Sequence, residues 1–321
     1  MPDFMFGLSS TVSFVQTGHA VTDMQWEFRE DGDEREQATR HELDLKLINI
    51  NLAGTYYFND WIGLSLRLPV RIVHSQAGFL REDESEIEGF ESGHHRDETL
   101  LGPGDLEVTA ITRHSGQFTP SLSWFISGSL GLTLPTGKVE DNPEVVGMWK
   151  TDHQHMFFGR GMPAPTLGLN GSLRMDWGFL EGSFSTTLPF LETASKEYLP
   201  PEGREWHEMG VWDLYEVGEY IAPQIFTGLF GIGSDFGTES WTFTGQLQAY
   251  HQSEAQWQGF PGVNSGRTEL LAGVRTSLVI SDTMIAELSV KVPVYLDMGT
   301  FGAKIKMPVL LGFGFYFTGD A

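Results

Sequence analysis

The sequence contains no cysteine, and its 321 residues include only 20 Lys and Arg against 43 Asp and Glu. Without cysteine the chain has no disulfides, no thiol nucleophile and no thiolate metal site. The formal net charge of -23 argues against a nucleic-acid partner, because phosphate binding requires clustered Lys and Arg. The same charge argues against docking on an anionic lipid surface.

Long apolar runs are also missing. No run of about 18 apolar residues is present, so the chain cannot span a membrane as a helix. What the sequence has instead is alternation, as in the stretch from Ser121 to Lys138. Apolar side chains occupy one parity there (Leu122, Trp124, Ile126, Leu130, Leu132, Leu134) and hydroxyl side chains the other (Ser121, Ser123, Ser127, Ser129, Thr133). A period of two predicts a β-strand with one apolar and one polar face.

This alternation recurs from end to end and predicts about twelve strands, each of roughly the length that crosses a bilayer when tilted. The expected strands are residues 4–16, 42–58, 61–74, 104–114, 120–135, 163–175, 178–190, 221–233, 240–251, 267–281, 284–296 and 304–317. In the second of them the apolar parity changes between Leu47 and Ile48, which predicts a β-bulge at that point.

The connections between these segments alternate between short and long. Short turns are expected near residues 59–60, 115–117, 176–178, 233–237 and 281–283, and long loops near 17–41, 75–103, 136–162, 191–220, 252–266 and 297–303. An outer-membrane barrel follows this rule, with short periplasmic turns, long external loops and both termini on the inner side. We therefore expect residues 1–321 to form a single all-β domain, a transmembrane antiparallel barrel in contact with outer-membrane lipid and lipopolysaccharide. A soluble β-sandwich is the alternative.

Two further residue types fit a barrel. Aromatic residues gather at the short-turn ends, as an interfacial girdle requires (Tyr56, Tyr57, Phe58, Trp61, Phe118, Trp124, Trp177, Phe179, Phe236, Trp241). Four prolines lie toward the long-loop ends of strands (Pro69, Pro135, Pro189, Pro293). Because proline removes a ladder donor, we expect these four to lie near strand ends or bulges.

Two short motifs carry a resemblance to a known family. Gly102-Pro-Gly-Asp-Leu-Glu-Val108 opens one strand, and Leu132-Thr-Leu-Pro-Thr-Gly-Lys138 ends the next hairpin. In these motifs the chain resembles the outer-membrane β-barrel family of the meta-pathway of phenol degradation, a group of proposed transporters. The resemblance implies a barrel that passes small, often hydrophobic, molecules, and it supplies no catalytic residues.

The polar face of the strands is the predicted lining of the lumen. Strand parity places nine charged residues inward (Arg67, Arg71, Glu107, Arg113, Arg174, Glu181, Arg275, Glu287, Lys291), among Ser, Thr and Gln residues that include Gln246 and Gln248. Charges inside a membrane are costly unless they are paired or hydrated, so they imply either a wet passage or a salt-bridged plug. The first predicts a porin-like channel for passive or facilitated diffusion of a small molecule. The alternative is a non-conducting barrel that anchors or scaffolds an envelope protein complex.

Two histidine pairs in expected outer loops are candidate metal ligands: His94, His95, His153 and His155. Imidazole is a common ligand of borderline metals, although loop histidines are most simply hydrated surface. The acidic runs at 29–36 and 82–88 are most simply solvated loop tips, with divalent-cation binding as the alternative.

Motifs for catalysis are incomplete. Lys138 is followed by Val139, which excludes a P-loop, and position 211 after His207 and Glu208 is Val, which excludes a zincin helix. No nucleophile with an oriented base is identified. We therefore predict no enzymatic activity, no catalytic residue and no cofactor.

Overall fold

The computed structural model describes residues 3–20, 40–87, 96–139, 158–189, 193–194, 219–236, 240–257, 260–261, 266–298 and 306–319. Within these ranges no helix is long and apolar enough to cross a membrane. The described secondary structure consists of strands, and nearly all of them belong to one sheet.

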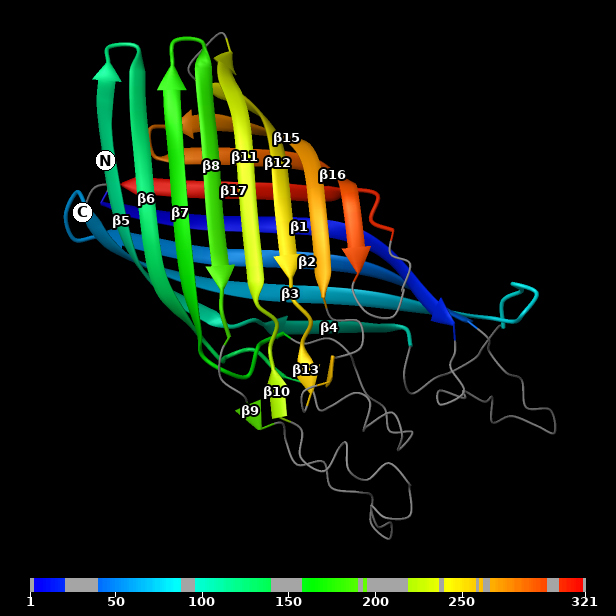
Figure 1. The fold of residues 1–321 in the computed structure, drawn as a ribbon. Coiled ribbons are helices and arrows are strands. Elements are labelled where there is room, and N and C mark those ends of the chain that lie inside the picture. The colour runs from blue at the N-terminus through cyan, green and yellow to red at the C-terminus, as the bar shows by residue number, and fades with distance from the viewer. Residues whose placement is uncertain are drawn as a thin grey trace, which may run out of the picture.

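That sheet is a closed barrel of twelve antiparallel strands, one of which is broken in two (Figure 1). Its members are β1 (Phe4–Ala20), β2 (Arg40–Tyr57), β3 (Ile62–Leu80), β4 (Glu98–Pro103) with β5 (Leu106–Thr119), β6 (Leu122–Leu134), β7 (Ala164–Met175), β8 (Gly178–Thr187), β11 (Ile225–Phe236), β12 (Trp241–Gln252), β15 (Arg267–Ser281), β16 (Met284–Met298) and β17 (Leu310–Gly319). The predicted all-β barrel and its strand order are confirmed.

The barrel closes where the first strand meets the last. β1 pairs with β17 from Phe4 opposite Gly319 to Ser13 opposite Leu310. The amide of Asp3 also donates to the carbonyl of Gly319, at 2.9 Å. Both ends of the described chain therefore lie side by side at the short-turn end of the barrel; the opposite end, which carries the long loops, is called the outer end below.

A second, small sheet lies beyond the barrel at its outer end (Figure 1). It pairs β9 (Thr193–Ala194), β10 (Glu219–Ile221), β13 (Gln256–Trp257) and β14 (Phe260–Pro261). Tyr220, Ala222 and Ala255 form its buried apolar cluster. The sequence did not predict this sheet, because its strands are too short to show a period.

The outer face of the barrel carries exposed apolar side chains. Examples are Leu66, which is 47% exposed, and Leu130, which is 62% exposed. An exposed aromatic girdle marks the short-turn end (Tyr56, Phe58, Trp61, Phe118, Trp177, Phe236, Trp241). Closure satisfies the strand backbones internally, so this apolar face meets lipid.

The bulge predicted between Leu47 and Ile48 is wrong. β2 pairs with both β1 and β3 along its whole length without a shift of register. The strand is therefore unbroken, and its apolar side chains lie on the inward face up to Leu47 and on the outward face from Ile48 onward. Outward positions are apolar at Ile48 and Ile50 and polar at Asp44 and Lys46, as expected where a strand leaves the membrane.

The predicted turn at 115–117 is also wrong, because β5 continues to Thr119 and the turn lies at Pro120 and Ser121. Register shifts occur elsewhere: between Gln117 and Thr119, and at two places in the pairing of β15 with β16. The expectation for proline is confirmed. Pro293 lies beside a register shift in β16 and Pro69 opposite the break between β4 and β5, and the other two follow strand ends.

Candidate functional site

The cross-strand register places the nine predicted lumen charges on one face of the barrel wall, opposite the exposed apolar face. One row of directly paired residues shows this well: Glu181, Gly231, Gln246, Gly273 and Lys291 follow one another across five neighbouring strands. Direct partners in an antiparallel sheet share a face. The charged and amide side chains of this row therefore all point into the barrel.

A polar network occupies the middle of the lumen. Arg275 donates to Glu181 at 2.8 Å and lies 3.9 Å from Glu287. The amide of Gln246 donates to Glu181 at 3.2 Å, and the hydroxyl of Ser277 donates to Glu287 at 3.0 Å. Each carboxylate thus has a cationic and a neutral partner, which offsets the cost of removing these charges from bulk water.

The charged side chains of this network lie along the wall, across glycines. A Cβ on Gly231 would meet Oε1 of Glu181 at 2.6 Å, and a Cβ on Gly273 would meet Cγ of Lys291 at 2.7 Å. By crossing Gly273, Lys291 reaches Oε1 of Gln248 and donates to it. The glycines leave room for the side chains of Glu181 and Lys291 to lie against the wall, and Arg275 reaches from β15 to Glu181 on β8.

Two other ion pairs are open to water although they point inward. Arg67 pairs with Glu107, and Arg174 pairs with Asp235, which also accepts a hydrogen bond from Thr242 at 2.9 Å. The Arg67 side chain is 52% exposed. Because Arg67 lies on the inward parity of β3, this exposure means that the described side chains leave space in the lumen at its level.

Arg113 has different surroundings from the other inward charges. It is 5% exposed, its Nε donates to the carbonyl of Asp60 at 3.0 Å, and its guanidinium lies 3.5 Å from the ring centroid of Tyr57. Since a stacked and hydrogen-bonded guanidinium is held firmly, Arg113 fixes the turn between β2 and β3 at the short-turn end.

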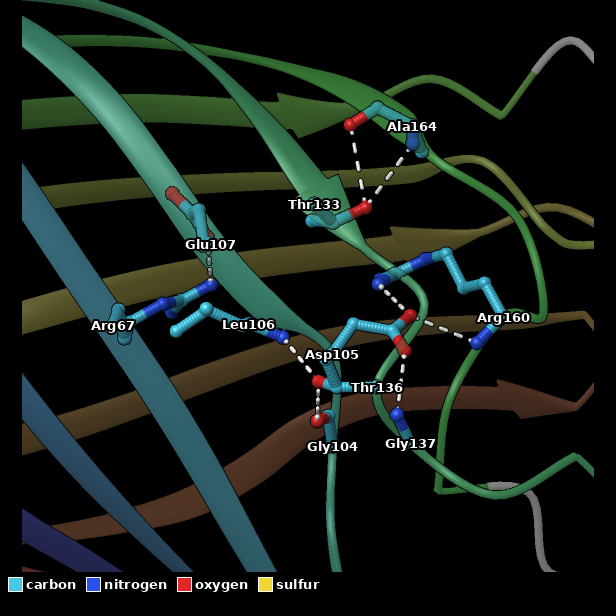
Figure 2. A network of polar contacts seen from close by, with 10 residues as sticks. All are labelled: Arg67, Gly104, Asp105, Leu106, Glu107, Thr133, Thr136, Gly137, Arg160 and Ala164. Atoms are coloured by element: carbon cyan, nitrogen blue, oxygen red, sulfur yellow. Dashed lines mark hydrogen bonds and ion pairs between the residues drawn. The ribbon is translucent and has the colours of Figure 1, made fainter.

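A second polar cluster, the outer-mouth cluster, is built where the strand formed by β4 and β5 is broken (Figure 2). Val70 pairs with Pro103 and Arg67 pairs with Glu107. Between these two pairs, residues 68–69 of β3 therefore lie opposite residues 104–106 of the broken strand. The hydroxyl of Thr136 bridges the break: it donates to the carbonyl of Gly104 and accepts from the amide of Leu106, both at 2.9 Å. The break is therefore a built feature of the wall.

Asp105 is the centre of the outer-mouth cluster, and its side chain is 2% exposed. Its carboxylate accepts from the amide of Gly137 at 3.1 Å and from the amide of Arg160 at 2.8 Å, and it lies 3.6 Å from the Arg160 guanidinium (Figure 2). Buried carboxylates that accept several N–H groups are well stabilised. Asp105 thereby ties the end of β6 to the segment that precedes β7.

The segment around Phe158 is packed tightly against this cluster. A Cβ on Gly137 would lie 2.6 Å from Cα of Gly159, and one on Gly159 would lie 2.4 Å from Oδ1 of Asp105. Phe158 is 6% exposed, and its ring lies over Gly102, an inward position of β4. The segment from Phe158 to Arg160 thus reaches into the outer mouth of the barrel and narrows it.

Arg71, Arg267 and Tyr250 stand at the same level. Arg267 pairs with Glu269 and lies 5.1 Å from the ring centroid of Tyr250, and the charge of Arg71 interacts with Arg160, Arg267 and Tyr250. Arg71 lies on the third strand of the ring and Tyr250 on the ninth, on opposite walls. Arg71 and Tyr250 therefore face the lumen from opposite walls.

The wall has a gap near this level. β17 begins only at Leu310, so its pairing with β1 ends at Ser13 and its pairing with β16 ends at Lys291. Further out, a single bridge between Gln16 and Lys306 joins β1 to the segment that precedes β17. A cavity of about 840 Å³ lies at this gap, lined by residues 14–16, 44–46, 293–296 and 306–308 with His74 and Gln76.

The predicted metal ligands His94, His95, His153 and His155 lie outside the described residues. Among the residues that are described, no three His, Asp or Glu side chains are grouped as a metal site requires. Part of the second acidic run is described: Asp83 accepts hydrogen bonds from the amide and hydroxyl of Ser85. These bonds favour the ionised form and lower the pKa of Asp83.

Several residues of the site were not predicted. Asp105 and Thr136 lie inside the two motifs that carry the family resemblance, which signalled their importance without assigning a role. Asp235 and Arg160 were missed because their partners lie on another strand or far along the chain. Glu269 was missed although its partner Arg267 lies two residues away on the same strand.

Comparison with known proteins shows the fold and nothing finer. No protein-family model matches the chain, and no curated protein matches it. Among solved structures it is similar to an outer membrane channel from Pseudomonas putida F1, with a TM-score of 0.52, 11% identity, and coverage of 96% of this chain and 95% of that one. This likeness shows the fold, a β-barrel of the outer-membrane kind.

More distant structures share only the general barrel shape. The Pseudomonas putida toluene transporter TodX gives a TM-score of 0.41 at 11% identity, covering 100% of this chain and 90% of that one. The translocator domain of the autotransporter NalP from Neisseria meningitidis gives 0.39 at 9% identity, covering 98% and 88%. At such scores neither carries an argument about this chain.

Proposed function

We propose that the protein is a channel of the bacterial outer membrane through which a small molecule diffuses passively. The observation that carries this proposal is the exposure of an inward side chain: Arg67 points into the barrel, yet its side chain is 52% exposed. A filled barrel would bury such a side chain. The exposed apolar band supports the membrane location.

In this proposal the inward charges define the passage at three levels. Arg174 and Asp235 stand near the short-turn end, and the network around Glu181 and Arg275 occupies the middle. The outer mouth is narrowed by the segment that Asp105 holds in place. The paired charges of the middle network would suit the alternative of a non-conducting anchor, but the exposed side chains of Arg67 and Arg174 favour the channel.

We infer a transport role and no catalysis. The similar solved structure is a channel, and the inward carboxylates of the described residues are engaged with Arg, Gln, Ser and Thr side chains, not with an oriented nucleophile and base. An apolar or aromatic substrate is the finer proposal, supported by inward Leu43, Leu45 and Leu47 at the outer end of β2.

The experiment is a liposome-swelling assay with the refolded protein and uncharged solutes of graded size. We expect swelling with the smallest solutes and a steep loss as size increases, because the outer mouth is narrow. Heat-unfolded protein in the same lipid is the control. Folded barrels, identified by heat-modifiable migration, that give no swelling with any solute would contradict the proposal.

A further inference from the structure

The cavity of about 840 Å³ at the wall gap lies on the outward side of the barrel. On β1, β2 and β3 its lining includes residues of the outward parity: Phe14, Gln16, Asp44, Lys46, His74 and Gln76. Val294 and Tyr295 of β16 line it from across the gap, and both are exposed. The outward side of the barrel faces the bilayer, so a lipid can enter this cavity.

The cavity lies where the outward face changes from apolar to polar. Ile48 of β2 pairs directly with Ile72 of β3, and both are outward apolar residues. One outward step nearer the outer end, Lys46 pairs with His74. Such a change marks the depth at which acyl chains give way to headgroups. Lys46 and His74 therefore lie at the headgroup level of the outer leaflet.

Two lysines at this level have no acidic partner among the described residues. Lys46 and Lys306 are both exposed, and within the described part of the chain neither belongs to an ion pair. Lys306 is bridged to Gln16 and so shares the outward face of β1. By contrast Arg40, further out on the same face of β2, is paired with Glu42 at 3.1 Å. In a chain with a net charge of -23, two such lysines indicate an anionic partner.

The two lysines can reach a single headgroup. Lys46 pairs with Phe14 of β1, and Gln16, two residues further out, is bridged to Lys306. Neighbouring strands about 4.8 Å apart, with a rise of about 3.4 Å per residue, place the two lysine Cα atoms roughly 12 Å apart. Flexible four-carbon side chains can close that distance onto a phosphate group, for which the lysine ammonium is a common ligand.

The cavity lining offers surfaces for both parts of an anionic lipid. Asp44 is the only carboxylate among the lining residues, against the two lysines and His74. Nδ1 of His74 is engaged with the hydroxyl of Thr99 at 2.9 Å, which leaves Nε2 for a ligand. The apolar part of the lining suits an acyl chain and includes Phe14, Val294, Tyr295 and Pro308.

The strand edges at the gap favour a polar headgroup over a bare hydrocarbon chain. The pairing of β17 with β1 ends at Ser13 and its pairing with β16 ends at Lys291. In the described structure, the backbone beyond these residues is bridged across the gap only at Gln16 and Lys306. Unpaired edge groups are costly in hydrocarbon, whereas a headgroup with hydroxyl, amide and phosphate groups can satisfy them.

We propose that the wall gap binds one molecule of lipopolysaccharide from the outer leaflet. A phosphate of its lipid A part lies on Lys46 and Lys306, and an acyl chain lies in the cavity against Phe14 and Val294. The site is local, because the surplus of carboxylates on the chain gives no general attraction to anionic lipid. The bound lipid covers the gap in the wall. This inference does not depend on what the lumen conducts.

The test is native mass spectrometry of the full chain refolded in detergent and titrated with diphosphoryl lipid A. We expect a saturable one-to-one complex that Lys46→Gln and Lys306→Gln each weaken roughly fivefold, because each removes one exposed charge pair. Lys46→Arg keeps the charge and should restore most of the binding. Arg40→Gln, on the same outward face but paired with Glu42, is the control and should leave binding unchanged.

Val294→Ser keeps the inference falsifiable if a lysine variant fails to fold, which heat-modifiable migration reveals. It should weaken lipid A binding at least about twofold, because it removes apolar contact only. Three results would overturn the inference: phosphate-free lipid A that binds as tightly as the diphosphoryl form, lysine variants that bind like the original chain, or inorganic phosphate that displaces lipid A. The last result would assign the lysines to a free anion.

Discussion

The two halves of β2 and β3 carry opposite patterns of side chains. From Ile48 and Ile72 toward the short-turn end, outward positions are apolar and inward positions are polar. From Leu47 and Val73 toward the outer end, outward positions are charged or polar, and inward positions are mostly apolar. The register is continuous through the change.

The difference shows that the polarity of each face of a strand matches the solvent, lipid or water, that the face contacts. In the first half lipid lies outside and water inside. In the second the outer face meets water, as the ion pair between Arg40 and Glu42 at 3.1 Å on the outward side of β2 indicates. The inner apolar face then needs another partner. Part of it packs internally, with Phe79 and Ile87 each 3% exposed, and the rest borders the lumen.

The largest expected effect comes from charging the lipid face of the first half. Leu66→Arg places a cation near mid-depth at a position that is 47% exposed, which costs about 2–4 kcal/mol. We expect a large loss of folded barrel in lipid vesicles, measured by heat-modifiable migration. Gln76→Arg, also outward on β3 but in the second half, should fold like the original chain. Equal yields of folded barrel for the two variants would contradict the claim that lipid contacts the outward face only in the first half.

The next effect concerns the anchor of the outer mouth. Asp105→Ala removes the acceptor of two backbone amides and the partner of Arg160, so we expect a loss of about 2–3 kcal/mol in the free energy of unfolding. The matched Asp235→Ala breaks the ion pair with Arg174, whose side chain is 60% exposed, and should cost only about 0–1 kcal/mol.

Urea unfolding in vesicles, followed by tryptophan fluorescence, measures both variants. If Asp105→Ala lowered the free energy of unfolding as little as Asp235→Ala does, the contacts of Asp105 would contribute no more than an exposed ion pair. The channel formed by Asp105→Ala should also conduct better, because the segment at Phe158 loses its attachment.

A smaller effect tests the middle network. Glu181→Gln keeps the size of the side chain and one acceptor oxygen, so it can retain only one of the hydrogen bonds from Gln246 and Arg275, and it removes one negative charge from the lumen. We expect the chloride-to-potassium permeability ratio to rise by roughly fivefold, the equivalent of about 1 kcal/mol between two charges 4 Å apart in water. The reversal potential in a salt gradient measures the ratio, and Ser172→Ala on the neighbouring strand is the control. An unchanged ratio would place Glu181 away from the ion path.

The smallest effect lies beyond the outer end, in the turn after β3. The hydrogen bonds from Ser85 lower the pKa of Asp83, so their contribution is present above the ordinary pKa of an aspartate and is lost as the pH falls through the lowered value. We expect the carboxyl carbon of Asp83 to titrate below its usual range by NMR, and Ser85→Ala to raise the midpoint. The same midpoint in both chains would exclude these bonds as the cause.

Much of the wall was predictable from the sequence because lipid and water impose a period of two on every strand. The strand bounds of β7, β15 and β16 follow the alternation closely. The parity change in β2 was visible, but periodicity alone cannot distinguish a bulge from a strand that leaves the membrane. Register with the two neighbouring strands decides between them.

The outer mouth was less predictable, since it depends on contacts between distant residues. Asp105 and Arg160 are joined only when β6 and β7 pair, and nothing local in the sequence marks Arg160. The two motifs at 102–108 and 132–138 did mark the place, because the glycines and Thr136 are needed for the close approach and the bridged break. The histidine prediction stays a prediction.

The central claim is that the polar lumen is an open path. Single-channel recording of the refolded protein in a planar bilayer tests it most directly, with heat-modifiable migration showing that the same preparation contains closed barrels. We predict discrete, reproducible conductance steps that increase in Asp105→Ala. A closed barrel that inserts into the bilayer and carries no current, in the original chain and in Asp105→Ala alike, would contradict the account.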